Sequence, residues 1–366
     1  MLLHLQKHQI NRQLRQQSTR AMTMIELLVV ITIIMVLTGV MIPTIRYQNR
    51  NRALREAERQ LNAFIGSAQA RAQQLGRPVG IWIERVNDGD PMVSANHSVS
   101  VYLAEVPLPY SGNLRNSFVK ITSAGVLTFH LPIITRYDSN TGLPIYAYDT
   151  ILHNINNHLI KRGDSFKIQF NYRGPYYDAV RNGNNYQLRN NQRHGRLPTA
   201  NLGSSSGIPY QIHRLPKKSF SPPLNLPAGT VIDLSVSGTM AGGYEFRTTN
   251  TSNRRPVIIM FNPSDGVATV WSNGIPNPPM GWIHLLVGRQ NQVSPTNLWL
   301  DEETEKGNVM DMNNRWVSID HRTGSIVSEN VDSIARFIAG SSNSSASDKI
   351  AAARQLVRSG TGSEGN

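Results

Sequence analysis

Residues 20–43 read RAMTMIELLVVITIIMVLTGVMIP, and this stretch decides what the start of the chain is expected to become. Between Met22 and Ile42, Glu26 is the only charged residue. A helix over residues 22–42 would be roughly 31 Å long, about the thickness of the hydrocarbon core of a bilayer. The sequence therefore predicts a transmembrane helix there. Its carboxylate would need a partner, because an unpaired charge in hydrocarbon is unfavourable.

The string from Ala21 to Glu26 resembles the class III signal of type IV prepilins and type II secretion pseudopilins. In that family a prepilin peptidase removes the leader and methylates the new terminal amine. The resemblance implies cleavage between Ala21 and Met22, N-methylation of Met22 and a helix kink at Pro43. It also implies that Glu26, with Thr23 beside it, registers one subunit against the next by neutralising the amine of a Met22. Ala21 and Met22 stand where most members have Gly and Phe.

A second apolar pattern follows the first. Apolar side chains recur from Leu54 to Leu75 mostly at steps of three or four, which is one stripe of an amphipathic helix. Gly76 followed by Pro78 indicates where this helix ends. The sequence thus predicts one helix over 22–76, with a transmembrane part over 22–42 and an amphipathic part over 44–76.

Short runs typical of strands occupy the rest of the chain, separated by turn residues and without strand–helix alternation. This pattern favours antiparallel sheets, and the last run reads as a hairpin with its turn at 321–324. The predicted fold class is α+β: a long N-terminal transmembrane-plus-amphipathic helix followed by an antiparallel β-rich, sandwich-like pilin domain. The runs cover residues 79–84, 98–106, 118–131, 165–172, 230–236, 255–263, 266–274, 282–289 and 316–329.

The helix end and the later strands together resemble the minor pseudopilin H and FimT family. The residues that carry the resemblance are Ala70, Arg71, Ala72 and Gly76, and the runs PVIIMFNPSDGVATVWSNG and WVSIDHRTGSIV. The predicted organisation is a cytoplasmic leader over 1–21, the helix over 22–76, a β-rich domain over 77–338 with a basic insertion over 172–223, and a low-complexity tail over 339–366.

The basic insertion is a candidate binding segment. Basic residues with tyrosines among them can follow a phosphate backbone and stack on bases. A solvated loop whose charge serves solubility explains the same composition. The candidate residues for binding DNA or an anionic envelope polymer are Arg173, Arg181, Arg189, Arg193, Arg196, Lys217 and Lys218.

No catalytic or metal-binding motif stands out. The ten histidines show no paired metal spacing, and the acidic run at 301–305 reads as a solvated loop more readily than as a calcium site. The chain of 366 residues has a net charge of +13 and contains no cysteine, which excludes disulfides and thiol chemistry. We expect a non-enzyme without cofactor, bound metal or small-molecule substrate.

The expected function is that of a minor pseudopilin in type II secretion, processed by prepilin peptidase and assembled with other pseudopilins or pilins. It would sit in the inner (cytoplasmic) membrane as a single-pass protein, with its C-terminal domain periplasmic or extracytoplasmic. Two alternatives remain open at this point. One is a minor type IV or competence pilin that binds DNA through residues 172–218, and the other is a plain single-span envelope protein.

Overall fold

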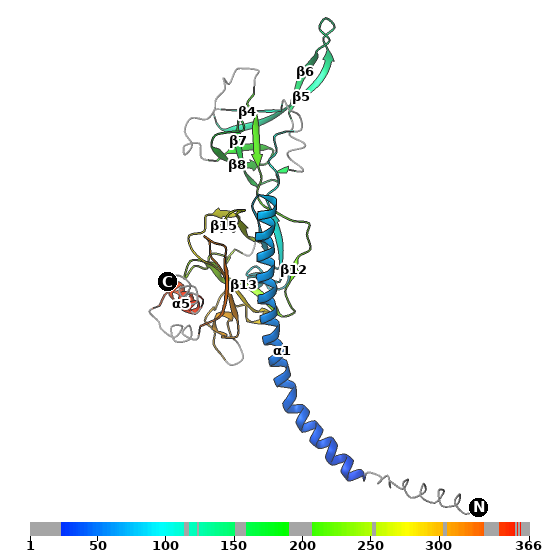
Figure 1. The fold of residues 1–366 in the computed structure, drawn as a ribbon, viewed down its shortest axis with the longest axis vertical. Coiled ribbons are helices and arrows are strands. Elements are labelled where there is room, and N and C mark those ends of the chain that lie inside the picture. The colour runs from blue at the N-terminus through cyan, green and yellow to red at the C-terminus, as the bar shows by residue number, and fades with distance from the viewer. Residues whose placement is uncertain are drawn as a thin grey trace, which may run out of the picture. The chain divides into compact units, whose positions relative to one another are not determined.

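The chain forms two compact units, Met1–Ala53 and Leu54–Asn366 (Figure 1). The structure is a computed structural model. It describes residues 23–112, 117–122, 124–150, 159–189, 207–250, 254–302, 306–332, 344–355, 357 and 359. The predicted leader over 1–21 lies outside these residues.

Helix α1 (Met24–Leu75) is one continuous helix whose last part belongs to the second unit. There its buried side chains recur every three or four residues and share one hydrophobic core with two sheets. This buried stripe matches the one expected from the sequence. Gly76 ends the helix with a φ of +60°, a left-handed conformation that glycine adopts without strain. The buried residues of the stripe are Leu54, Ala57, Leu61, Ile65, Ala68 and Ala72.

The described structure does not support the predicted transmembrane helix over 22–42. Within the part of the chain that the structure describes, no helix is both long enough and apolar enough to cross a membrane. The structure therefore does not support the predicted single-pass location in the inner membrane.

The predicted fold class is wrong for the same reason. The prediction was an α+β fold that begins with a transmembrane-plus-amphipathic helix. No described helix can cross a membrane, and beyond α1 the described chain is mostly β-sheet. Three sheets account for it, and all their strand pairs are antiparallel.

Sheet A has the strand order β11-β3-β1-β14-β15-β16, with β12 also paired to β3. Its inner face carries alternate residues of β1, β3 and β14 into the core that contains α1. The outer face carries Trp82, Ile258 and Trp271. The strands are β1 (Val79–Glu84), β3 (Ser100–Glu105), β11 (Lys217–Lys218), β12 (Leu224–Asn225), β14 (Val257–Phe261), β15 (Val267–Ser272) and β16 (Ile275–Asn277).

Sheet B has the order β19-β18-β17-β13-β2 and completes the same core. The hairpin expected over 316–329 is present as β18 and β19, which pair from Arg315 opposite Asn330 to Ile319 opposite Ile326. The strands are β2 (His97–Ser98), β13 (Thr230–Thr239), β17 (Ile283–Arg289), β18 (Arg315–Ile319) and β19 (Ile326–Asn330).

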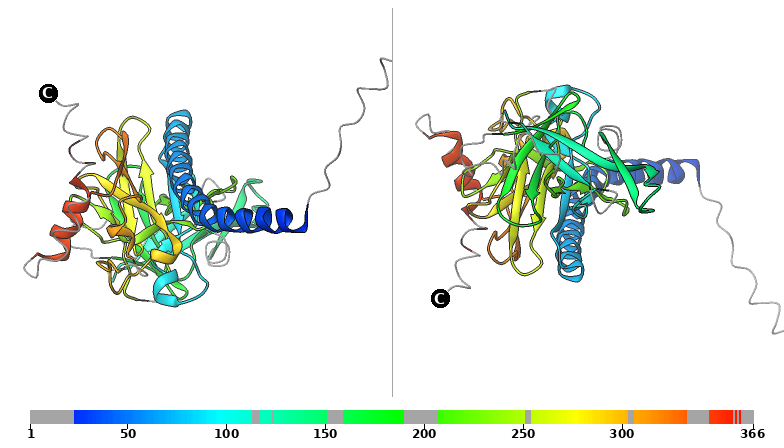
Figure 2. Two further views of the ribbon diagram at one scale, coloured as in Figure 1. Left: turned by 90° about the horizontal axis from the view of Figure 1, so that it is seen from below. Right: turned by 90° about the horizontal axis from the view of Figure 1, so that it is seen from above.

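Helix α5 (Ala346–Ala353) packs on the face of sheet B that points away from α1, as all three views show (Figure 2). Helix α5 and sheet B share a separate hydrophobic core, and beside it the Trp316 indole donates to the Ala353 carbonyl at 3.0 Å. The helix lies within residues 339–366, the range predicted as a low-complexity tail. Further short helices within the described ranges are α2 (Pro91–Ser94), η3 (Gln290–Gln292) and η4 (Asn308–Met310).

Sheet C, in the order β10-β7-β8-β9-β5-β4 with β6 paired to β5, has a core of its own. All its strands lie between β3 and β11 in the sequence, and these two strands pair with each other in sheet A. Sheet C is thus an insertion that leaves and re-enters sheet A at one place. It consists of β4 (Phe118–Ile121), β5 (Val126–Tyr137), β6 (Pro144–Thr150), β7 (Ser165–Phe170), β8 (Tyr176–Asn182), β9 (Asn185–Leu188) and β10 (Tyr210–His213).

Candidate functional site

Thr23 and Glu26, both predicted from the sequence as site residues, cap the start of α1. The Glu26 carboxylate accepts from the Thr23 backbone N–H at 3.0 Å and from the Thr23 hydroxyl at 3.1 Å. In return, the Glu26 N–H donates to the Thr23 hydroxyl oxygen at 3.3 Å. This reciprocal arrangement is a capping box, which satisfies backbone groups that a helix start leaves unpaired. The role in subunit registration stays a prediction.

The first part of α1 exposes apolar side chains around its whole circumference. Every side chain described over 24–39 is exposed, and Glu26 is the only charged residue among them. The hydroxyls of Thr32 and Thr38 donate to carbonyls of their own helix, Leu28 at 2.8 Å and Ile34 at 2.7 Å, so they need no water. A helix that is apolar all round is normally buried. The large exposed side chains are Met24, Ile25, Leu27, Leu28, Val29, Val30, Ile31, Ile33, Ile34, Met35, Val36 and Leu37.

Other predicted residues of this region are not tested. Ala21 and Met22 lie outside the described residues, so cleavage and N-methylation stay predictions. At Pro43 the backbone is part of α1, while the side chain is not described. The kink at Pro43 therefore also stays a prediction.

The predicted basic residues fall into different environments. Arg181 is buried, and its guanidinium donates to the carbonyls of Gly183 at 2.9 Å and Ile160 at 2.7 Å. Arg173 and Arg189 are exposed on sheet C. Arg193 and Arg196 lie outside the described residues.

The two remaining basic residues, Lys217 and Lys218, lie on β11 of sheet A. The Lys218 ammonium forms an ion pair with Glu84 at 2.6 Å and lies 3.5 Å from the centre of the Tyr102 ring. Lys217 is half-buried, and for it no carboxylate partner occurs among the described residues. The sequence had grouped these lysines with the arginines of sheet C, but their surroundings differ.

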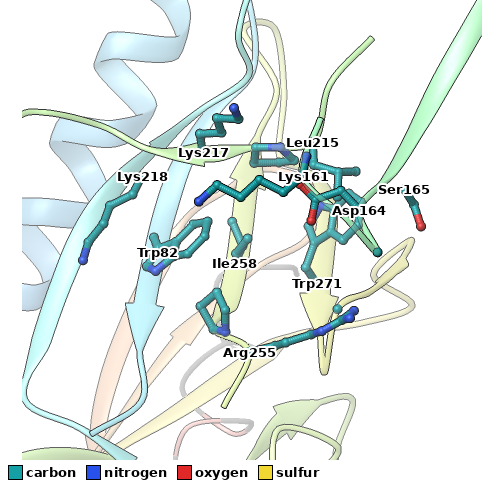
Figure 3. A pocket seen from close by; sticks show the side chains of 14 residues that line it. Trp82, Lys161, Asp164, Ser165, Leu215, Lys217, Lys218, Arg255, Ile258 and Trp271 are labelled. Atoms are coloured by element: carbon teal, nitrogen blue, oxygen red, sulfur yellow. The ribbon is translucent and has the colours of Figure 1, made fainter. Parts of the chain in front are cut away.

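Lys217 lines a cavity of about 480 Å³ on the outer face of sheet A (Figure 3). One wall is the turn before β7, another is the segment that returns from sheet C to β11, and the floor is sheet A. A row of cross-strand neighbours forms this floor, since Trp82 is paired with Ile258 and Ile258 with Trp271. The other lining residues are Lys161, Gly163, Asp164, Ser165, Leu215, Pro216, Lys218, Arg255, Pro256 and Gly274.

The lining is cationic. Lys161, Lys217, Lys218 and Arg255 contribute four positive side chains against the single carboxylate of Asp164. Burial lowers the pKa of Lys217, the nearby charges of Arg214 and Lys161 lower it further, and Asp164 partly opposes them. The cavity is therefore arranged to favour an anion over a cation.

Trp82 lines the cavity, but its indole N–H is covered by protein. Trp82 Nε1 is buried and makes no hydrogen bond to any described residue. Because protein atoms cover this N–H, it does not contribute to ligand binding in the cavity. No group of three or more His, Asp or Glu side chains that could hold a metal ion occurs in the described ranges.

No known protein family, curated protein or solved structure matches this chain. The sites are thus interpreted from their own geometry. Of the cavity residues, sequence reasoning had proposed only Lys217 and Lys218. It missed Trp82 and Trp271, although the alternation over 79–84 already places Trp82 on the face opposite Ile81 and Ile83. That alternation was the available signal.

Proposed function

We propose that this chain is a structural subunit of a filament of the pilus type, most similar in role to a minor pseudopilin. In this proposal the apolar part of α1 packs against the same part of neighbouring subunits. The observation that supports it is the helix surface over 24–37, which is apolar on every side and uncovered in the single chain.

The energetic argument rests on burial. Moving one Leu, Ile or Val side chain from water into a packed interface contributes about 1.5–3 kcal/mol. The twelve large apolar side chains exposed between Met24 and Leu37 give neighbouring helices enough surface to associate. The other end of α1 is fixed in the core of the second unit, so a subunit held through this surface would carry its sheets with it.

The leader motif supplies the second support. The resemblance of residues 21–26 to the class III signal implies cleavage before Met22 by prepilin peptidase, which would leave Thr23 and Glu26 next to the new terminal amine. Type II secretion is the machine we propose. The competence alternative is not favoured, because Arg181 is held in buried hydrogen bonds and neither Arg173 nor Arg189 lines the cavity that Lys217 and Lys218 share.

Cross-linking tests the packing of α1. The chain has no cysteine, so a single Ile34→Cys substitution introduces a unique thiol on the exposed surface. In cells that express the chain with its companion subunits, we expect oxidation to link Ile34→Cys chains to one another or to companions. Ser264→Cys, exposed in the turn between β14 and β15, is the matched control and should stay monomeric. Equal cross-linking at both positions, or none at Ile34, would contradict the proposal.

Intact mass and N-terminal sequencing from the same cells test the processing. A chain that begins at Met22 and carries one added methyl group is the expected result. A retained leader would refute the pseudopilin assignment.

A further inference from the structure

We infer that the cavity over Trp82, Ile258 and Trp271 is a binding site for a small ring-bearing anion. Its charged group would lie against Lys161 and Lys217, and its ring would lie on the tryptophan floor. The shared chemistry is a phosphate, sulfate or carboxylate attached to a ring with a flat apolar face. This site is independent of the α1 surface, since no α1 residue lines it.

The floor recognises a ring. Trp82 and Trp271 lie on strands β1 and β15, with one strand between them, so their backbones are roughly 10 Å apart. Ile258 fills the space between the two indoles and is itself buried, whereas both tryptophans are half-exposed toward the cavity (Figure 3). Two indoles at this spacing offer a flat apolar surface on which one or two rings can stack.

The walls recognise the charge. In the described structure neither Lys161 nor Lys217 has an ion-pair partner, whereas Lys218 is paired with Glu84. Asp164 is the one carboxylate of the lining, and it accepts from the Lys161 backbone N–H at 3.1 Å. An anion in the cavity would offset the repulsion between Lys161 and Lys217.

The size and the lining favour a small ligand over a nucleic acid chain. A volume of about 480 Å³ is in the usual range for small-molecule sites. A groove that follows a nucleic acid backbone needs a continuous line of cations. Arg173 and Arg189 do not line the cavity, and Arg181 is engaged inside sheet C.

Calorimetry with the purified full chain tests the site. The probes are adenosine monophosphate, glucuronate and inorganic phosphate, which separate a phosphate-bearing ring, a carboxylate-bearing ring and the bare anion. We expect one or both ring anions to bind at least tenfold more tightly than inorganic phosphate and to change tryptophan fluorescence. The ring anion that binds more tightly identifies the source of the charged group.

Variants assign the binding to this cavity. The double variant Lys161→Gln and Lys217→Gln should weaken binding at least tenfold. Trp271→Leu should do the same, because it keeps an apolar residue but removes the flat surface. Arg162→Gln removes a neighbouring exposed charge outside the lining and should leave the affinity unchanged. Far-UV circular dichroism of every variant should match that of the unsubstituted chain.

Three results would overturn the inference. The first is inorganic phosphate binding as tightly as both ring anions, and the second is no binding of either ring anion. The third is an affinity that rises with the length of a single-stranded oligonucleotide, which would indicate a nucleic acid groove. None of them changes cross-linking at Ile34, so failure here and failure of the filament proposal are distinguishable.

Discussion

At the scale of single residues, Glu26 combines two roles that separate substitutions can distinguish. In the structure it caps α1 through Thr23, and in the proposed filament its charge would also neutralise the amine of Met22. A glutamine at this position preserves the capping box, since both Glu and Gln serve there. It removes only the charge.

We therefore expect Glu26→Gln to keep the helix start intact yet lose cross-linking at Ile34. Thr23→Val should do the opposite: it removes the hydroxyl of the cap, costs about 1 kcal/mol of helix stability and leaves assembly in place. Cross-linking of each variant in the Ile34→Cys background is the measurement. Full cross-linking of Glu26→Gln would show that Glu26 acts only as a cap.

We expect Arg354 to contribute strongly to the free energy of unfolding. Its guanidinium is fully buried, lies 4.7 Å from the Trp316 ring and donates to the carbonyls of Val236 at 2.7 Å and Gly243 at 2.9 Å. It donates to Met240 as well, at 2.9 Å. Burial lowers the pKa of Arg354 to about 9, although Glu245 opposes the shift.

Arg354→Met should lower the free energy of unfolding by about 3–5 kcal/mol, because it leaves buried carbonyls without donors. Urea denaturation measures this change, and Arg173→Met, at an exposed arginine, is the control. A variant as stable as the original chain would show that the fold does not depend on the hydrogen bonds of Arg354.

At the scale of elements, the segment around η4 is joined to β17 by a buried ion pair. Arg289 and Asp311 approach to 3.3 Å, and both side chains are largely buried. Burial alone would raise the pKa of Asp311, but hydrogen bonds from Asn313 and the charge of Arg289 outweigh it, so the pKa lies below the usual 3.8. A lowered pKa in the folded state means that the ionised form stabilises the fold.

This stabilisation should be present above pH 3.8 and be lost as the pH falls through the lower folded pKa of Asp311. Asp311→Asn should therefore reduce the free energy of unfolding by about 1.5–3 kcal/mol at pH 7. The difference from the unsubstituted chain should shrink progressively below pH 3.8. Urea denaturation over this pH range measures it, with exposed Asp178→Asn as the control. A difference that stays constant with pH would exclude the ion pair as its cause.

At the scale of the whole molecule, sheet C is an insertion with its own core. Glu105 at the end of β3 is directly opposite Lys217 at the start of β11. Such a pair can be closed by a two-residue turn, for which Asn-Gly is the preferred sequence. The core formed by α1 and sheets A and B contains no residue of sheet C.

Replacing residues 106–216 by Asn-Gly should therefore leave α1 and sheets A and B folded. We expect one cooperative urea transition with a smaller m value, since less surface is exposed on unfolding. The shortened chain should still cross-link at Ile34 but lose the ring-anion site, which needs Lys161 and the returning segment. A shortened chain that does not unfold cooperatively would show that sheet C supports the main core.

The sequence alone determined the features that repeat over a few residues. The stripe from Leu54 to Ala72 and the alternation in β1 are local, because an element buries whichever residues fall on one face. The class III leader pattern is local too, although its consequences await experiment. The predicted transmembrane helix came from the same local hydrophobicity, and the described helix did not support it.

Only the tertiary structure decided which distant segments meet. The insertion that the sequence placed at 172–223 consists partly of strands of sheet C, whose first strand begins at Phe118. The cavity needs Trp82, Lys161, Lys217 and Trp271 at one place, and long-range strand pairing brings them there. Arg181 has the same charge as Lys217, yet it lies in buried hydrogen bonds inside sheet C. Charge is a property of the residue, whereas burial and partners are set by the packing of the whole chain.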